Sequence, residues 1–233
     1  YDWQVMAMGT NTDPYQPVEK TLQITRSILE VLAAFNHPVG IVTKSALVLR
    51  DIDILGPMAE KGLAQVCVSV TTLDRRLANR LEPRAATPTL RIETLRGLAK
   101  AGIPCGVMAA PMIPALNDWE LEDILETARD AGATLASYIL LRLPLEIAGL
   151  FEEWLETHVP NRAKHVMSLI HGTRGGKAYD SNFATRMRGT GEYAAMLRKR
   201  FEIAAARLGL NPQDRNRLDT TLFRPPFERD GQM

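Results

Sequence analysis

The sequence predicts an α/β fold in which a parallel sheet is followed by a helical C-terminal extension. Short β-branched or apolar runs alternate with longer stretches at helical spacing, which is the pattern of βα units. After Pro144 the pattern becomes helical. At 233 residues, of which 45% are hydrophobic and 24% charged, the chain has the composition of a globular protein with a substantial core.

Five stretches have the length and the β-branched or apolar composition of buried strands. They cover residues 3–8, 39–43, 64–70, 104–110 and 137–141. The first begins at residue 3, whereas parallel strands are normally flanked and covered. We therefore expect the first βα unit of the fold to be absent and the edge at residues 3–8 to expose apolar surface.

The stretches between these strands have helical periodicity. Ile24, Ile28, Leu32 and Phe35 fall on one face of a helix, which we expect to cover the sheet. Further helices are predicted at residues 51–61, 89–100 and 120–131, each followed by a glycine that suits a left-handed C-cap, namely Gly62, Gly102 and Gly132. Beyond the sheet, helices are predicted at 145–158 and 191–208, with a last strand or an ordered tail at 218–223.

The composition also bears on location and redox state. No apolar run reaches the roughly 18 residues of a membrane span, and no basic and apolar leader opens the chain. We therefore expect a cytoplasmic protein without a membrane partner. Cys67 and Cys105 are isolated in apolar surroundings, which predicts buried free thiols rather than a disulfide.

The formal net charge of +1 hides an uneven distribution. Residues 1–161 carry 14 Lys and Arg against 20 Asp and Glu, whereas residues 162–217 carry 12 against 4. Such a basic segment attracts polyanions, and the alternative is a solvated helical surface. On the helix from Gly191, we expect Arg198, Lys199 and Arg207 to point outward, toward a phosphate backbone or toward the acidic 120–130 helix. The face expected to be buried comprises Ala194, Leu197, Phe201, Ala204 and Leu208.

Polar residues collect just after the predicted strands. In parallel β/α barrels the active site lies at the C-terminal ends of the strands. The polar positions are residues 9–14, 43–45, 69–74 and 109–118, and Arg142. Together they predict the mouth of a pocket. Taken singly, Lys44 also suits a surface charge, Asp74 and Asp118 suit helix N-caps, and Met112 suits core packing.

Five segments, in order, resemble successive segments of radical S-adenosylmethionine (SAM) enzymes of the spore photoproduct lyase kind. They are GTNTDP, VTKS, VSVTTLD, LEPRAATPTLRIETLRGLAKAGI and GVMAAPMIPALND. The resemblance implies a partial parallel (β/α) barrel from the second strand onward over residues 1–145, with residues 146–233 as a helical extension packed on it. It implies a [4Fe–4S] cluster that reduces SAM to a 5′-deoxyadenosyl radical, which abstracts hydrogen from an unassigned substrate, nucleic acid being one candidate. It also implies an electron donor such as flavodoxin or ferredoxin.

The resemblance further implies which residues contact SAM. Thr12 and Asp13 match positions near the polar groups of the methionine part, and Lys44 matches the lysine after the next strand. Ser69 is expected on the ribose hydroxyls, and Arg84, in the loop that begins with Glu82 and Pro83, on the carboxylate. The set is completed by Ala110 and Met112 beside adenine, and by Thr10.

Two departures from the family pattern stand out. The family's CxxxCxxC cluster motif does not occur in the chain, and Cys67 and Cys105 lie too far apart to replace its three thiolates. We therefore expect the cluster ligands upstream of this chain and expect the chain as given to be inactive. In addition, Thr10 stands where the lyase has the cysteine that returns hydrogen to its substrate, so thymine-dimer reversal by that route is not expected.

Two other interpretations are compatible with the residues. One is a cluster-free β/α-barrel enzyme that uses Lys44 as a Schiff-base or charge-stabilising lysine. The other is a nucleic-acid-binding module that uses the basic segment 162–217. The sequence assigns no catalytic residue and no metal ligand.

Overall fold

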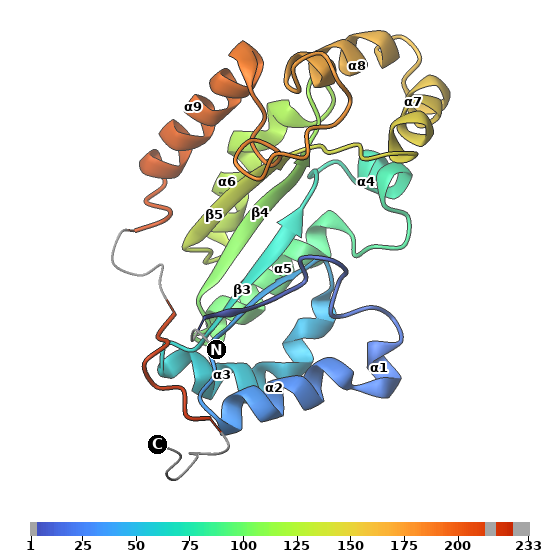
Figure 1. The fold of residues 1–233 in the computed structure, drawn as a ribbon. Helices are drawn as coiled ribbons and strands as arrows, with labels where there is room; N and C mark the ends of the chain where they lie inside the picture. Colours follow the sequence, from blue (N-terminus) through green and yellow to red (C-terminus); the bar gives the residue numbers. More distant parts are fainter. Residues whose placement is uncertain (1–3, 213–217, 226–233) are drawn as a thin grey trace, which may run out of the picture.

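The computed structural model describes residues 4–212 and 218–225 (Figure 1). Five parallel strands form one open sheet in the order β1-β2-β3-β4-β5. The strands are β1 (Met6–Met8), β2 (Val39–Thr43), β3 (Ala64–Val70), β4 (Cys105–Met112) and β5 (Leu135–Leu140). The predicted α/β class and parallel sheet are therefore confirmed. The bounds of β2 and β3 agree with the prediction, whereas β1 is shorter, β4 extends two residues further, and Trp3 lies outside the described residues.

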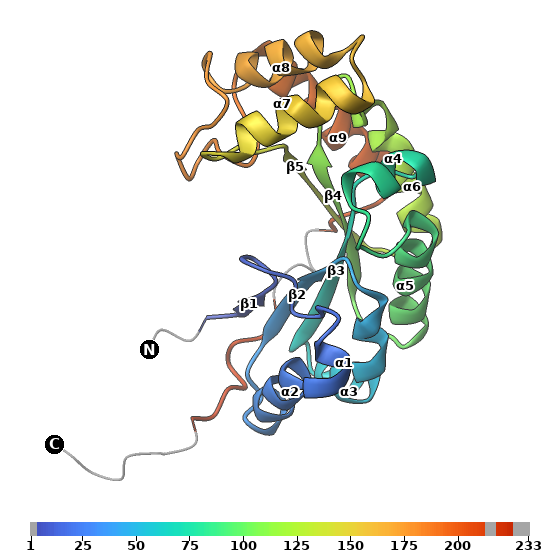
Figure 2. The ribbon, with the colours of Figure 1, turned by 90° about the vertical axis from the view of Figure 1, so that its right-hand side faces the viewer.

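Helices connect successive strands along one face of the sheet. Figure 2 shows α2, α3, α5 and α6 following the outer face of the curved sheet, while α7 and α8 lie beyond the C-terminal strand ends. The helices are α1 (Glu19–Leu22), α2 (Ile24–Ala34), α3 (Ile52–Glu60), α4 (Arg75–Leu81), α5 (Pro88–Lys100), α6 (Leu121–Asp130), α7 (Ile147–His158), α8 (Ala163–Gly172) and α9 (Gly191–Arg207), with short 3₁₀ turns η1 (Ala46–Asp51) and η2 (Asp118–Glu120). The predicted helices do not include α1 or α8, and for α4 the sequence indicates only the N-cap, Asp74.

The buried face of α2 differs from the predicted one. Ile24 and Ile28 are 55% and 38% exposed, whereas Thr25 and Leu29 are buried. Thr25 is buried because its polar groups are satisfied: its hydroxyl donates to the Pro14 carbonyl at 2.5 Å and its N–H to Glu19 at 3.0 Å. A prediction based on the spacing of apolar residues does not include these hydrogen bonds. The predicted buried face of α2 is therefore rotated about the helix axis from the observed one.

The edge strand β1 exposes apolar side chains, as predicted. Its pairing within the described residues is with β2, and Val5 and Met6 are more than one-third exposed. Ile24 and Ile28 of α2 line the same hollow as Met8. Apolar side chains of β1 and of the outer face of α2 therefore line one hollow together with polar residues of the loop after β1.

The described residues pack into two hydrophobic clusters. The larger one joins β3 and β4 to α2, α3, α5, α6 and α9. Four of the five positions predicted for the buried face of α9 belong to it, and Leu208 packs against it. The smaller cluster lies at the C-terminal strand ends and contains Ile113, Leu116, Leu143 and residues of α7 and α8. The division into domains at residues 145 and 146 stays a prediction.

The chain returns to the N-terminal side of the sheet near its end. Asp219 donates its N–H to Gly62 at 2.9 Å, and Arg224 donates its N–H to Phe35 at 3.0 Å. The Phe223 ring meets His37 edge-on at 4.8 Å between ring centroids. Residues 218–223 are thus an ordered tail rather than a strand. In the described parts of the chain, no helix has the length and apolarity required to cross a bilayer.

Candidate functional site

The loop after β1 is held against the end of β2 by Asp13. One carboxylate oxygen of Asp13 accepts from the Tyr15 N–H at 2.9 Å and the Thr43 hydroxyl at 2.7 Å, and the other accepts from the Lys44 N–H at 2.8 Å. The loop can approach β2 this closely because Gly9 has no side chain: a Cβ there would lie 1.9 Å from the Val42 carbonyl oxygen. These bonds place Asp13 and Lys44 at the C-terminal ends of neighbouring strands.

Lys44 forms an ion pair with Glu82, which belongs to the segment after α4. Glu82 also accepts from the Thr71 hydroxyl at 2.8 Å and from Arg91 at 2.8 Å. Arg91 is only 2% exposed and donates further to the Ser69 and Ala86 carbonyls. Burial works against the ionisation of Glu82, but the charges of Lys44 and Arg91 outweigh it and hold the pKa of Glu82 below its usual range.

These groups border an open cavity of about 510 Å³. Asp13, Lys44 and Arg84, all predicted site residues, line it together with Glu82 and Tyr15. Arg84 is exposed and forms no ion pair with any carboxylate in the described residues. With Lys20, the cavity is lined by three cationic and two anionic side chains, so it offers partners for both charged groups of a zwitterionic amino acid.

The other predicted site residues lie around this cavity rather than in it. Thr10 and Thr12 line an adjoining hollow of about 490 Å³ that shares Asp13 with the first. Ser69 and Ala110 are buried at the ends of β3 and β4, where the Ser69 hydroxyl donates to the Ala110 carbonyl at 3.2 Å. Met112 is fully buried in the larger core cluster.

A buried polar framework, not predicted as such, supports the ends of β3 and β4. The Asn117 amide donates to the Thr71 carbonyl at 2.6 Å and accepts from the Ile113 N–H at 2.6 Å. Glu120 accepts from the Thr72 hydroxyl and the Leu73 N–H, both at 2.6 Å. One of the two predicted helix N-caps is confirmed, because Asp74 caps α4. The carboxylate of Asp118 caps no helix and instead accepts from the Tyr193 hydroxyl at 2.5 Å.

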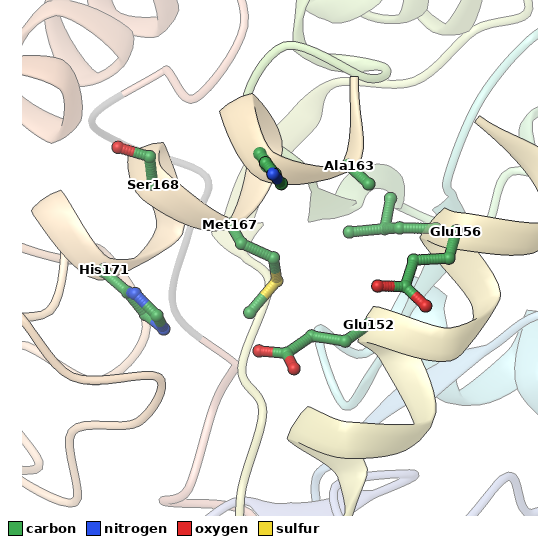
Figure 3. A pocket seen from close by; sticks show the side chains of 8 residues that line it. Glu152, Glu156, Ala163, Met167, Ser168 and His171 are labelled. Atoms are coloured by element: carbon green, nitrogen blue, oxygen red, sulfur yellow. The ribbon is translucent and has the colours of Figure 1, made fainter. Parts of the chain in front are cut away.

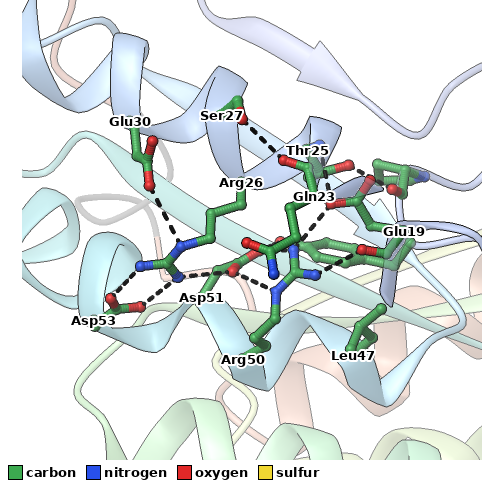
Figure 4. Close-up of polar contacts among 12 residues, drawn as sticks. Glu19, Gln23, Thr25, Arg26, Ser27, Glu30, Leu47, Arg50, Asp51 and Asp53 are labelled. Atoms are coloured by element: carbon green, nitrogen blue, oxygen red, sulfur yellow. Dashed lines mark hydrogen bonds and ion pairs between the residues drawn. The ribbon is translucent and has the colours of Figure 1, made fainter. Parts of the chain in front are cut away.

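A second polar network fixes the segment between β1 and α2 (Figure 4). Asp51, which is fully buried, accepts from the Tyr15 hydroxyl at 3.1 Å, from Arg26 at 3.0 Å and from Arg50 at 2.8 Å. Arg50 reaches on to Glu19 at 3.0 Å. Burial, with the negative charge of Asp51, raises the pKa of Tyr15 well above its usual range. Tyr15, a wall of the 510 Å³ cavity, is thereby held as a neutral phenol.

A further cavity of about 420 Å³ lies between α7 and α8. Figure 3 shows Glu152 and Glu156 of α7 facing Met167 and His171 of α8 across it. It shares no lining residue with the cavity at Asp13 and includes no predicted site residue.

The two cysteines do not form a metal site. Cys105 is buried in β4, and Cys67 is partly buried in β3. Burial raises the pKa of Cys67 to about 11 and that of Cys105 to about 12, so both are neutral thiols at pH 7. Within residues 4–212 and 218–225, no three His, Cys, Asp or Glu side chains gather as metal ligands would. The described residues therefore do not fit an iron–sulfur cluster.

The basic C-terminal segment is partly tied to the sheet domain. On α9, Arg200 binds Glu122 of α6 through two bonds of 2.8 and 2.5 Å, and Arg207 lies 3.7 Å from Glu126. Arg198 and Lys199 are exposed, as expected. Two further members of the segment, Arg215 and Arg217, fall outside the described residues.

Comparisons with known proteins identify related sequences. The family model described as "Radical SAM superfamily" matches residues 4–128. "Uncharacterized protein Rv2578c" of Mycobacterium tuberculosis is 34% identical over 168 residues, which is 71% of this chain and 49% of that protein. "Uncharacterized protein MJ0683" of Methanocaldococcus jannaschii is 32% identical over 113 residues, 48% of this chain and 42% of that protein. The chain thus spans about half the length of these curated relatives.

Solved structures of spore photoproduct lyase share the fold. The enzyme "complexed with dinucleoside spore photoproduct" has a TM-score of 0.64 at 16% identity, covering 89% of this chain and 60% of that one. A mutant "with bound AdoMet and dinucleoside spore photoproduct" has a TM-score of 0.54 at 15% identity, covering 90% and 61%. At these identities the likeness is one of fold.

Proposed function

Because the chain belongs to the radical SAM superfamily, and is therefore part of a radical SAM enzyme, we propose that the cavity at Asp13, Lys44 and Arg84 binds SAM. The observation that carries the proposal is that these three residues, which come from three separate segments, line one cavity of about 510 Å³. This volume is within the range of small-molecule sites. When bound and reduced, SAM supplies the radical that takes hydrogen from the substrate.

The side chains suit the charged end of SAM. Arg84 has no carboxylate partner in the described chain, and its fork of N–H donors suits the SAM carboxylate. Asp13 accepts three hydrogen bonds inside the protein and, as a carboxylate, has one acceptor position left for the SAM ammonium. Lys44 and Glu82 neutralise each other at the same wall. We keep Thr10, Thr12, Ser69, Ala110 and Met112 as further predicted contacts.

We also propose that activity depends on a [4Fe–4S] cluster whose cysteines lie outside the described residues, with flavodoxin or ferredoxin as electron donor. Family membership and the partial coverage of the relatives support this. The chain as given is then expected to bind SAM without cleaving it. The alternative use of Lys44 as a Schiff-base lysine is disfavoured by its ion pair with Glu82, because a Schiff base forms from the neutral amine.

SAM binding can be measured without the cluster, by isothermal titration calorimetry on the chain as given. Arg84→Gln should weaken binding by about tenfold or more, since a charge-assisted hydrogen bond is worth roughly 1.5–3 kcal/mol. The matched control is Arg75→Gln, an exposed arginine at the start of α4 that does not line the cavity. Wild-type protein that fails to bind SAM, or equal affinities in the two variants, would contradict the proposal.

Nucleic acid remains a proposed partner of the basic segment, although fewer of its cations are free to contact phosphates than the sequence alone indicates. Arg200 and Arg207 pair with carboxylates of α6, which leaves Arg198 and Lys199 as exposed cations of α9 without a carboxylate partner in the described residues. Two phosphate contacts give a slope of log affinity against log salt of about −1.8 on duplex DNA. Fluorescent DNA and RNA titrated at several salt concentrations test this, and binding that is unchanged in the double variant Arg198→Ala, Lys199→Ala would remove this surface as the contact.

A further inference from the structure

Arg142 stands directly beyond the end of β5 and has no carboxylate partner among the described residues. Its guanidinium has two polar contacts: one Nη donates to the Tyr179 hydroxyl at 3.3 Å, and the other lies 3.7 Å from the Met187 sulfur. Its Nε is buried and has no acceptor among the residues that the structure describes. Both contacts are weak for a guanidinium, which prefers oxygen acceptors at about 2.7–2.9 Å.

Four other partly or fully buried arginines of this protein are paired differently. Each has at least one carboxylate within 3.0 Å, and they are Arg26, Arg50, Arg91 and Arg200. Removing a guanidinium from water without a counter-charge is costly. The contrast with these four arginines marks Arg142 as a cation whose partner is not supplied by the described protein.

The surroundings of Arg142 add positive charge. Arg174, which is buried, donates to the Leu141 carbonyl at 3.0 Å and to the Arg186 carbonyl at 2.8 Å, and in the described part of the chain it too has no carboxylate partner. Burial, opposed in part by Asp180 and reinforced by the charge of Arg142, lowers the pKa of Arg174. The carboxylate nearest in sequence is Asp180, which is used within its own loop by the Thr185 hydroxyl and a backbone N–H.

Aromatic rings hold the neighbouring arginines in place. The guanidinium carbon of Arg188 lies 4.3 Å from the ring centroid of Tyr138, and that of Arg186 lies 3.5 Å from the ring centroid of Phe183. Neither arginine has a carboxylate partner in the described chain. Cation–π contacts fix the position of a guanidinium while leaving its charge uncompensated, so the segment from Arg174 to Arg188 remains electropositive.

We propose that Arg142, oriented by Tyr179 and reinforced by the charge of Arg174, binds a phosphate-type oxyanion at the C-terminal end of β5. A guanidinium fork and a phenol hydroxyl are suited to donate together to a tetrahedral oxyanion. The site is on the same edge of the sheet as the Asp13 cavity, since parallel strands end together. That the oxyanion belongs to the substrate rests on the proposed function, whereas the anion site itself does not.

The test uses ³¹P line-broadening titrations of the chain as given with inorganic phosphate and with methyl phosphate. Saturable binding is expected, and Arg142→Gln should weaken it by about tenfold or more. Arg142→Lys, which keeps the charge but not the fork, should give a smaller loss, and Tyr179→Phe should weaken binding without removing the charge. Tighter binding of methyl phosphate would identify an esterified phosphate as the ligand, and tighter binding of inorganic phosphate would identify the free ion.

The matched control is Arg198→Gln, which removes an exposed, unpaired arginine from α9 and should leave phosphate binding unchanged. Circular dichroism and thermal unfolding establish that each variant is folded. Absence of saturable phosphate binding to the wild type, or equal losses in Arg142→Gln and Arg198→Gln, would overturn the proposal. SAM titrations run in parallel separate the two hypotheses: phosphate binding without SAM binding rejects the proposed function and leaves this site standing, and the reverse rejects this site alone.

Discussion

Replacing Glu82 with glutamine tests the ion-pair network at the Asp13 cavity. The carboxylate of Glu82 is 16% exposed and faces two cations, Lys44 and Arg91, the latter only 2% exposed. The amide keeps the shape of the side chain but leaves the buried guanidinium of Arg91 without its counter-charge. From hydrogen bonds to charged groups, we expect a loss of about 2 kcal/mol in the free energy of unfolding at pH 7. For a chain of this length that is a fall of roughly 4–8 °C in the melting temperature.

The stability difference between wild type and Glu82→Gln should depend on pH. The pKa of Glu82 is lowered in the folded protein, so its stabilising effect is present above the unfolded pKa of about 4.3 and is lost as the pH falls through the lower folded value. The difference between wild type and Glu82→Gln, measured by urea unfolding, should therefore be constant from pH 7 to pH 5 and shrink below pH 4.

A surface ion pair on α5, the helix that carries Arg91, provides the control. Glu93 and Arg96 of α5 pair with side chains 53% and 51% exposed, so Glu93→Gln should cost less than about 0.5 kcal/mol at any pH. If Glu82→Gln costs no more than this control, or if its cost is the same at pH 7 and pH 3.5, the network does not stabilise the site as argued.

Three further predictions concern packing, thiols and helix docking. Gly106→Ala places a Cβ 2.6 Å from the Leu135 Cβ between β4 and β5 and should cost about 1–3 kcal/mol in thermal unfolding, whereas Gly149→Ala in α7, with open space around it, should stabilise by up to about 1 kcal/mol. Cys67 and Cys105, with pKa values of about 11 and about 12, should react with iodoacetamide at pH 8 many times faster in urea than in the folded protein; equal rates would show that they are accessible. Arg200→Ala, which removes a two-bond contact to α6, should cost about 1–2 kcal/mol in urea unfolding, and no measurable loss would show that α9 docks through its apolar face alone.

Much of the fold could be predicted from the sequence because a buried parallel strand is a short apolar run that can be recognised within its own segment. β2 and β3 are short, mainly apolar or β-branched runs with clear ends, and their predicted bounds agree with the structure to the residue. Helix α4 has the sequence RRLANRL, whose few apolar residues give little periodicity, although its cap Asp74 was recognised. The prediction for the buried face of α2 is wrong because Thr25 is buried through hydrogen bonds to residues outside the helix.

The site was predictable only where position along the chain determines position in space. Asp13 and Lys44 follow adjacent parallel strands, so their proximity follows from the fold class. The pairing of Lys44 with Glu82, and of Glu82 with Arg91, depends on how the segment after α4 turns back over the strand ends. Spacing in the sequence does not encode that turn, and the same holds for the contact of Arg142 with Tyr179.

The sequential order of the sheet has a consequence for how the chain acquires its structure. Each strand pairs with the strand that follows it along the chain, so partners such as Met6 and Val39, or Gly106 and Leu135, are fewer than about 40 positions apart. Closing loops of this length is a moderate entropic cost that recurs at every step rather than one large cost at the start. The sheet can therefore grow by adding one βα unit at a time to its last edge, in the order in which a ribosome releases them.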